Sequence, residues 1–275
     1  MYDFDRTLCT RDMQEFSFIP SLGMSAGEFW GAANELSRRE QADGILAYMY
    51  TMLREAAKAG RPIVRDELVR QGAELEFFPG VSDWFGRINR YAAAMGVTVE
   101  HYVLSSGLRE IIEGSAISGE FTRIFASEFL YDERGYAVWP KTAVNYTSKT
   151  QFIYRINKGI LDISNDADLN RSTPEGERRV LFTNMLYIGD GLSDVPCMKM
   201  VEAYGGRSIA LYWDGRQSVA DDLLLHGRVS FREKADYSEG SGLETTVRNI
   251  ILHMAAKTKL DSAHFEQVAQ AGEKA

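Results

Sequence analysis

Residues 185–194 read MLYIGDGLSD, an apolar run that ends in a glycine-bearing turn with two aspartates. A second stretch has the same form, because the apolar run at 97–104 leads directly into a Ser-Ser-Gly turn at 105–107. Short apolar runs that end in polar, glycine-containing loops are typical of strands in α/β proteins. A further strand is expected over 208–212, and helical patterns lie between the strands. The alternation predicts a parallel sheet covered by helices on both faces.

Residues 11–76 interrupt this alternation, because their apolar residues are spaced as in helices and no strand pattern occurs among them. Ser25 and Glu28 have the spacing of a capping box at the start of one helix. Helical spacing continues as far as Gly60, which is expected to end a second helix, and a shorter helix is expected over 66–71. The sequence therefore predicts an all-helical segment inserted directly after the first strand.

Three other segments have distinct patterns. Only two residues precede Asp3, whereas a buried strand normally has four to eight apolar residues, so the first strand is expected to be short. The polar segment 166–179 contains Pro174 and Gly176 and is interpreted as a surface loop. Residues 261–275 have the pattern of a short helix at the end of the chain.

Composition excludes several classes of function. The chain has 275 residues, of which 45% are hydrophobic and 25% charged, as in folded globular proteins. A net charge of −8 opposes non-specific binding to nucleic acid. No apolar run is long enough to span a membrane. Cys9 and Cys197 lack metal-site or disulfide spacing, and this fits the reducing cytoplasm, which is the expected location.

Acidic residues follow two of the expected strands. Ligands of an open parallel sheet bind at the carboxyl ends of its strands, so these residues are candidates for a site. Asp3 and Asp5 lie two residues apart, and alternation turns both toward one face. Asp190 and Asp194 follow another strand; taken alone, either pair could serve a turn or a helix cap. Together these carboxylates would repel one another unless a divalent cation or a basic side chain neutralised them.

Lys149 is the candidate for that basic side chain. It stands at the expected start of a helix that contains Phe152 and Ile156, and helix N-termini share an edge with strand carboxyl ends. Lys158 is the alternative, but it lies nine residues further on, about 14 Å along the helix axis. The position of Lys149 is therefore favoured.

Taken in their order along the chain, these motifs resemble the four motifs of the haloacid dehalogenase (HAD) superfamily of aspartate-nucleophile phosphatases. The first motif resembles the DFDRTL of residues 3–8, the second Ser105, the third Lys149 and the fourth the GDGLSD of residues 189–194. The resemblance implies a Rossmann-like parallel sheet core, the HAD fold, with an inserted α-helical cap.

The same resemblance implies a division of the chain. The HAD-like core would comprise residues 1–10 and 77–255, and residues 11–76 would form a helical cap similar to the C1 caps of phosphoserine phosphatases. Residues 256–275 would then form a C-terminal helical tail.

For each motif residue the resemblance implies a role. Asp3 would attack phosphorus and form an aspartyl-phosphate, and Asp5 would act as the general acid and base. Asp194 would orient Lys149 or a metal-bound water. Phosphate binding is assigned to Thr7, Ser105, Ser106, Gly107 and Lys149. Mg²⁺, the implied cofactor, is assigned to Asp3, Asp5, Asp190 and Asp194.

The implied substrate is a small phosphorylated metabolite. A phosphomutase of the same family is an alternative, and so is a binding or regulatory protein with a catalytically idle HAD fold. The intact acidic set argues against an idle site, since uncompensated carboxylates would repel one another. Arg6, Ser106 and Asp12 depart from the pattern of phosphoserine phosphatases, and this disfavours phosphoserine itself.

Overall fold

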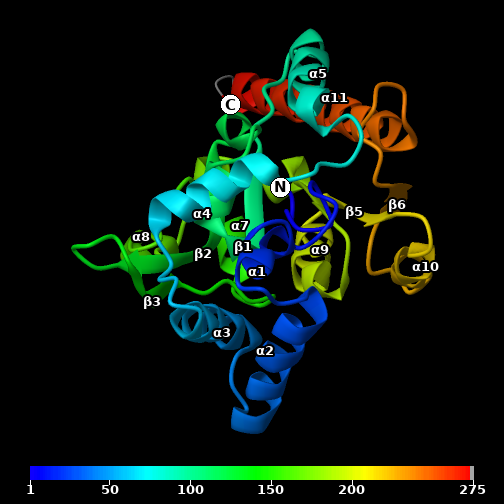
Figure 1. Cartoon of the computed structure of the whole chain (residues 1–275). Coiled ribbons are helices and arrows are strands. Elements are labelled where there is room, and N and C mark those ends of the chain that lie inside the picture. Colours follow the sequence, from blue (N-terminus) through cyan, green and yellow to red (C-terminus); the bar gives the residue numbers. More distant parts are fainter. Residues whose placement is uncertain (273–275) are drawn as a thin grey trace.

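The computed structural model describes residues 1–272 and confirms the α/β class (Figure 1). Its sheet is centred on the first residues of the chain. Tyr2 forms parallel bridges with Val103 on one side and with Ile188 on the other. These bridges join two three-stranded groups, β1-β2-β3 and β4-β5-β6. Within them β1–β2, β4–β5 and β5–β6 pair in parallel, and only β2–β3 is antiparallel. The strands are β1 (Tyr102–Leu108), β2 (Arg123–Tyr131), β3 (Ala137–Thr142), β4 (Leu186–Gly189), β5 (Arg207–Tyr212) and β6 (Phe231–Lys234).

Helices cover the two faces of the sheet, and each face has its own buried core. Successive strand residues point to opposite faces. Val103 and Ile188 accordingly pack in the core beneath α5 and α11, whereas Leu104 and Tyr187 pack in the core beneath α7, α9 and α10. The covering helices are α5 (Val81–Ala94), α7 (Lys149–Lys158), α9 (Val195–Ala203), α10 (Gln217–Leu225) and α11 (Gly242–Gly272).

The segment after the first strand is helical. Its helices are α1 (Phe18–Ser21), α2 (Ala26–Glu40), α3 (Gly44–Lys58) and α4 (Arg65–Gln71). The expected capping box is present, because the Ser25 side chain accepts from the Glu28 amide while the Glu28 carboxylate accepts from the Ser25 amide. In Figure 1, α2 and α3 form a helical pair that projects from the rest of the molecule.

By contrast, α4 is packed against α6 (Arg109–Glu113), which follows β1. A Cβ atom placed at Gly114 would lie 1.7 Å from the carbonyl oxygen of Val69, so glycine is required for this close approach. The part of 11–76 that extends beyond the core is therefore the α2–α3 pair.

Several local expectations were wrong. Strand β1 begins at Tyr102 rather than at 97, and the expected turn 105–107 lies inside the strand, where the register with β2 shifts. The expected loop 166–179 contains α8 (Asp166–Asn170) and a 3₁₀ turn. Strands β2, β3 and β6 had no counterpart in the expected elements. The 3₁₀ turns are η1 (Met13–Glu15), η2 (Gly72–Glu74), η3 (Ser118–Glu120), η4 (Glu175–Glu177), η5 (Phe182–Asn184) and η6 (Leu192–Asp194).

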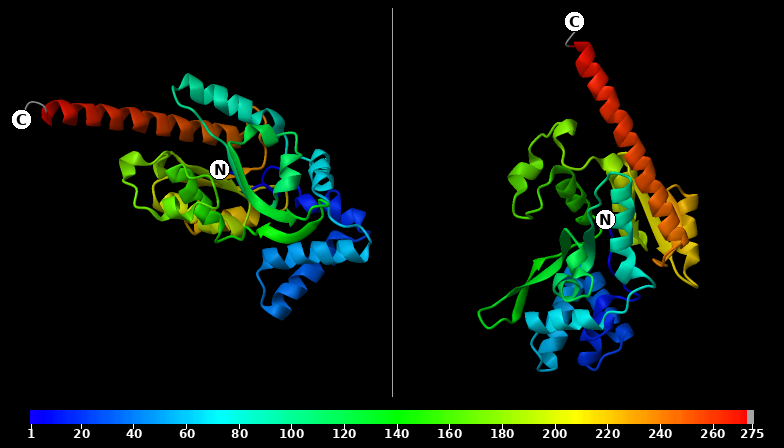
Figure 2. Two further views of the ribbon diagram at one scale, coloured as in Figure 1. Left: turned by 90° about the vertical axis from the view of Figure 1, so that its left-hand side faces the viewer. Right: turned by 90° about the horizontal axis from the view of Figure 1, so that it is seen from above.

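The helix at the end of the chain is also longer than expected. Helix α11 runs without a break for 31 residues and extends well past the sheet (Figure 2). It includes most of the expected tail 256–275, of which residues 273–275 lie outside the described part. Within residues 1–272, no helix has both the length and the apolar character needed to cross a membrane.

Candidate active site

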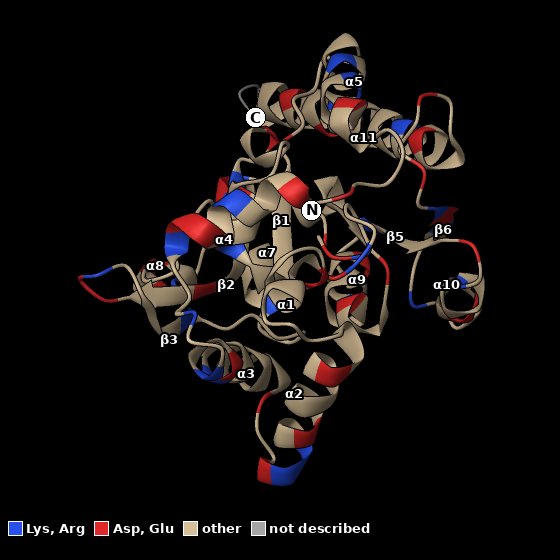
Figure 3. Cartoon of the chain, viewed as in Figure 1, with Lys and Arg blue, Asp and Glu red and all other residues tan. Residues whose placement is uncertain are grey.

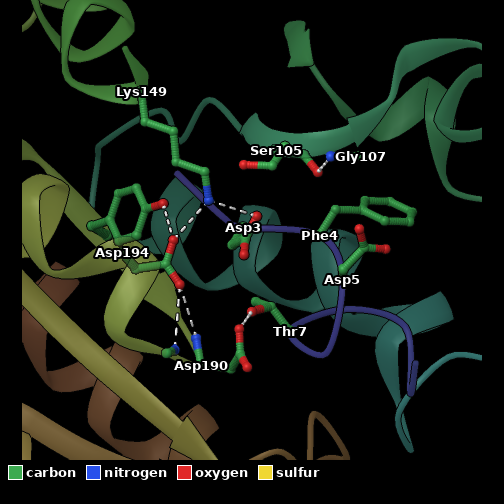
Figure 4. Close-up of polar contacts among 12 residues, drawn as sticks. Asp3, Phe4, Asp5, Thr7, Ser105, Gly107, Lys149, Asp190 and Asp194 are labelled. Carbon is green, nitrogen blue, oxygen red and sulfur yellow. Dashed lines mark hydrogen bonds and ion pairs between the residues drawn. The ribbon is translucent and has the colours of Figure 1, made fainter. Parts of the chain in front are cut away.

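The backbone of the first strand places Asp3 at the carboxyl edge of the sheet. The Leu104 amide donates to the carbonyl of Tyr2 at 2.8 Å, and the Asp3 amide donates to the carbonyl of Ile188 at 2.9 Å. Asp3 therefore leaves the sheet between β1 and β4. Lys149, at the first turn of α7, lies with its Nζ 2.9 Å from Asp3 Oδ1 (Figure 4). The structure thus brings together two residues that are far apart in the sequence.

Asp194 holds the other side of the Lys149 ammonium. Its Oδ1 lies 2.8 Å from Lys149 Nζ and also accepts from the Tyr187 hydroxyl at 2.8 Å. Its Oδ2 accepts from the amides of Asp190 and Gly191 at 3.2 and 3.4 Å. Both oxygens are therefore engaged by donors, and the carboxylate fixes the position of Lys149.

Two features show how specific this arrangement is. A Cβ atom at Gly189 would lie 2.4 Å from Asp194 Oδ2, so glycine at the end of β4 allows the carboxylate to approach. Lys158, the alternative lysine, lies at the far end of α7. Its ammonium donates to the carbonyls of Leu169 and Arg171, both at 2.6 Å, and has no contact with the acidic residues.

Asp5 lies on the other side of Asp3, against the end of β1. Its Oδ1 accepts from the Met13 amide at 2.8 Å. A Cβ atom at Gly107 would lie 2.8 Å from Asp5 Oδ2 and 2.1 Å from Met13 Cε, so a larger residue here would displace the Met13 side chain and crowd the acid. The Gly107 amide donates to Ser105 Oγ at 3.0 Å, and this orients the serine within the same edge (Figure 4).

Thr7 and Ser106 complete the set of residues expected to bind phosphate. Thr7 is buried, and its hydroxyl lies 3.5 Å from Asp190 Oδ1. The Ser106 carbonyl accepts from the hydroxyls of Tyr48 and Ser127 at 2.7 and 3.0 Å. Since Tyr48 belongs to α3, the projecting helices are hydrogen-bonded to the strand that carries Ser105.

The site carries more acidic groups than basic ones, and Figure 3 shows acidic segments between β1 and α9, near the N-terminus. Burial raises the pKa of Asp3 to about 7, with the Asp194 charge adding to the rise and Lys149 opposing it. Burial and neighbouring carboxylates also raise the pKa values of Asp5 and Asp190 well above the usual range. Although burial favours a neutral amine, Asp194 and Asp3 hold the pKa of Lys149 above its ordinary value.

This donor set fits a hard divalent cation. Asp3, Asp190 and Asp194 each offer a carboxylate oxygen, and these oxygens lie within 4.8 Å of one another. Asp194 already accepts hydrogen bonds on both oxygens, whereas the side-chain contact of Asp190 is the long one from Thr7. Asp3 and Asp190 are therefore the side chains with acceptor capacity left, and oxygen donors of this kind suit Mg²⁺.

Sequence reasoning missed the tyrosines that support the site. Tyr187 lies in the apolar run that was expected to be a strand, and its hydroxyl reaches Asp194. Tyr237 donates to the carbonyl of Thr7 at 2.8 Å, and Tyr48 donates to the carbonyl of Ser106 at 2.7 Å. A buried tyrosine hydroxyl needs a partner, so a tyrosine three residues before Asp190 was a usable signal. Nothing in the sequence around Tyr237 indicates its contact.

Comparisons with known proteins agree with the α/β fold. An uncharacterized protein of Borreliella burgdorferi is 27% identical over 271 residues, which cover 88% of this chain and 92% of that protein. A solved phosphoserine phosphatase has a TM-score of 0.52 at 12% identity and is covered over 90% of its length by 84% of this chain. A HAD family hydrolase of Salmonella enterica serovar Typhi has a TM-score of 0.51 at 16% identity. The match covers 84% of this chain and 65% of the Salmonella protein, just under two thirds of its length.

The match to a family completes the comparison. The model of the haloacid dehalogenase-like hydrolases matches residues 1–199, and this span contains Asp3, Ser105, Lys149 and Asp190. It covers well over half of the chain. The chain therefore belongs to the haloacid dehalogenase-like hydrolases.

Proposed function

We propose that this hydrolase is a Mg²⁺-dependent phosphatase that cleaves small phosphorylated metabolites through an aspartyl-phosphate on Asp3. The observation that carries the proposal is the buried row of Asp3, Lys149 and Asp194, with Asp5 on one side and Asp190 on the other. A carboxylate beside a fixed ammonium can act as a nucleophile toward phosphorus, because the ammonium offsets the charge of the phosphoryl oxygens.

The reaction is proposed in two balanced steps. In the first, an Asp3 oxygen forms a bond to phosphorus while the ester bond to the leaving oxygen breaks, and Asp5 gives that oxygen its proton. In the second, water attacks the phosphorus and gives a proton to Asp5, so that phosphate leaves and Asp3 is restored. The raised pKa of Asp5 favours the protonated acid that the first step requires.

Binding of the phosphoryl group is assigned to residues of the same edge. Ser105, Gly107 and Lys149 would donate to its oxygens, with Thr7 and Ser106 beside them. Mg²⁺ would be held by Asp3, Asp190 and the main-chain carbonyl of Asp5, with Asp194 in support. When bound, Mg²⁺ neutralises carboxylate charge and polarises the phosphoryl group.

We further propose that residues 11–76 act as a cap whose projecting part is α2–α3. Two contacts support this: the Tyr48 hydroxyl donates to Ser106, and the Asn145 amide donates to Asp43 Oδ2 at 2.8 Å. Both contacts tie the start of α3 to the edge where the site lies, so closure of the pair would exclude water from it.

A cytoplasmic location is part of the proposal. Cys9 and Cys197 are both buried and unpaired in disulfides, as suits a reducing compartment.

The proposal is tested by measuring inorganic phosphate released from a generic aryl phosphate and from a panel of small phosphomonoesters. We expect release with Mg²⁺ and none in EDTA. Asp3→Asn should abolish release, whereas the matched surface variant Asp83→Asn should retain it. Equal release in Mg²⁺ and EDTA, or none from any substrate with Mg²⁺, would refute the proposed function.

A further inference from the structure

Arg6 is the centre of a charged group at the edge of the site, which we call the Arg6 cluster: Arg6, Asp12, Glu15 and Trp30. Arg6 Nε lies 3.1 Å from Asp12 Oδ1, and its Nη2 lies 2.8 Å from Asp12 Oδ2. This is the two-pronged geometry of a strong guanidinium–carboxylate pair. Glu15 Oε1 lies 4.0 Å from Arg6 Nη2 and accepts from Trp30 Nε1 of α2 at 2.8 Å.

The cluster adjoins Asp5, which in the proposed reaction gives the leaving oxygen its proton. Arg6 directly follows Asp5, the proposed general acid. Met13, which directly follows Asp12, donates its amide to Asp5 at 2.8 Å. In the proposed reaction the leaving group at Asp5 would therefore lie beside the Arg6–Asp12 pair, and the bond from Trp30 to Glu15 places α2 against the same cluster.

The backbone of Arg6 is unusual as well. Its φ is 56°, in the left-handed region that non-glycine residues rarely adopt. Such conformations persist where the surrounding contacts fix them. The amides of Thr7 and Leu8 both donate to the carbonyl of Phe4 and close the turn, and the two bonds to Asp12 hold the guanidinium. The turn between Asp5 and Thr7 therefore holds the guanidinium at one defined place.

The free hydrogen-bonding group that this cluster offers to a ligand is a donor of Arg6. Both Asp12 oxygens are bound by Arg6, and Glu15 accepts from Trp30, so the acidic members already have donors. The Arg6 side chain is 37% exposed, and neither of its bonds to Asp12 uses Nη1. A ligand on this side meets a fixed guanidinium edge with an available donor.

We propose that Arg6 selects phosphomonoesters whose leaving group carries an anionic oxygen, a carboxylate or a second phosphate, and rejects those with an ammonium group there. This inference rests on the proposed phosphatase function. The anionic oxygen would accept from Arg6 Nη1, and the planar guanidinium suits such groups. An ammonium at the same place would face the guanidinium and find Asp12 already paired.

The test compares kcat/KM for small phosphomonoesters that differ in the leaving group. The leaving group carries a carboxylate in phosphoglycolate, a second phosphate in a propanediol bisphosphate and an ammonium in phosphoethanolamine, and it is uncharged in glycerol phosphate. We expect one of the two anionic substrates to exceed glycerol phosphate, and phosphoethanolamine to be the poorest. Comparing kcat/KM for the two anionic substrates shows whether Arg6 prefers a carboxylate or a second phosphate on the leaving group.

Substitutions of Arg6 measure the contribution of its guanidinium group to this selectivity. Arg6→Gln should lower the ratio of kcat/KM for the preferred anionic substrate to that for glycerol phosphate by about 10–100-fold, the loss expected for a hydrogen bond between charged groups. It should also raise the relative rate with phosphoethanolamine, because Asp12 is freed. Arg6→Lys should keep part of the ratio by retaining the charge. The matched control Arg39→Gln, which breaks an exposed pair with Glu40 in α2, should leave the ratio unchanged.

The outcomes separate the two claims. If the aryl phosphate is hydrolysed but phosphoethanolamine equals or exceeds the anionic substrates, the role of Arg6 is refuted and the phosphatase function stands. The same holds if both Arg6 variants keep the wild-type ratio. If no substrate, including the aryl phosphate, releases phosphate with Mg²⁺, the proposed function fails and this inference fails with it.

Discussion

Removing the ammonium of Lys149 should destabilise the fold in a way that depends on pH. The Lys149 side chain is 1% exposed, and its partners Asp3 and Asp194 are 9% and 0% exposed. Breaking a buried ion pair by removing one partner typically costs about 3–5 kcal/mol, because the remaining charges stay buried without compensation. Lys149→Met leaves Asp3 and Asp194 buried without their cation. We therefore expect a loss of this size in the free energy of unfolding at pH 8.

The loss in the free energy of unfolding caused by Lys149→Met should become smaller as the pH falls. Without Lys149, which lowers the pKa of Asp3, this pKa in the folded protein rises further, whereas in the unfolded chain it stays near the ordinary value of 3.8. The folded variant then binds more protons than the unfolded chain above about pH 4, so its stability falls as the pH rises from there through the raised pKa. At pH 5 part of the cost is removed by protonation.

Lys158→Met is the matched control, since this lysine is on the same helix and its partners are the uncharged carbonyls of Leu169 and Arg171. Its effect should not differ between the two pH values. Urea denaturation at pH 5 and pH 8 in EDTA measures both variants. An equal loss for Lys149→Met at the two pH values, or a larger pH dependence for Lys158→Met, would refute the reasoning.

Three further predictions concern the same edge. Tyr187→Phe removes a hydrogen bond to Asp194 and should lower kcat by about 10-fold or more with little change in KM, measured by steady-state kinetics. Asp5→Asn removes the general acid and should lower kcat by about 10²–10⁴-fold. Because burial raises the pKa of Asp3 from 3.8 to about 7, the metal-free protein should lose stability as the pH rises through this window. Mg²⁺ competes with these protons, so it should raise Tm more at pH 8 than at pH 5 in thermal denaturation; an equal rise would contradict this.

The sequence was sufficient to predict the convergence of the acidic edge. Asp190 follows an apolar run, Asp3 follows the short first strand and Lys149 begins a helix. A parallel sheet brings strand ends and helix starts to one edge. The choice between Lys149 and Lys158 followed from the length of the helix alone. The contacts of Asp194 with Lys149 and Tyr187 required the structure, because they join separate segments.

Other features were not predictable by the same reasoning. The polar residues 105–107 resemble a turn, yet they continue β1, because Ser105 accepts from Gly107 and the Ser106 carbonyl accepts from Tyr48 of a distant helix. Tertiary contacts here outweigh local preference. The length of α11, in contrast, had a local signal, since neither proline nor glycine occurs between Leu243 and Ala271.

The ion pair of Arg6 with Asp12 also depended on the folded chain. The sequence places an arginine between Asp5 and Thr7, but whether its side chain reaches solvent, substrate or an acid follows from the left-handed turn at Arg6. Only the structure shows that Asp12 is already neutralised when a ligand arrives.

The most direct test of the account is to identify the residue that carries phosphate during turnover. The enzyme is mixed with Mg²⁺ and an aryl phosphate whose phosphorus is labelled, quenched in acid within one turnover, and mapped by peptide mass spectrometry. We predict a hydroxylamine-sensitive acyl phosphate on Asp3, absent from Asp3→Asn and present in the control Asp83→Asn. A label on any other residue, or full activity of Asp3→Asn, would contradict the assignment of Asp3 as the nucleophile.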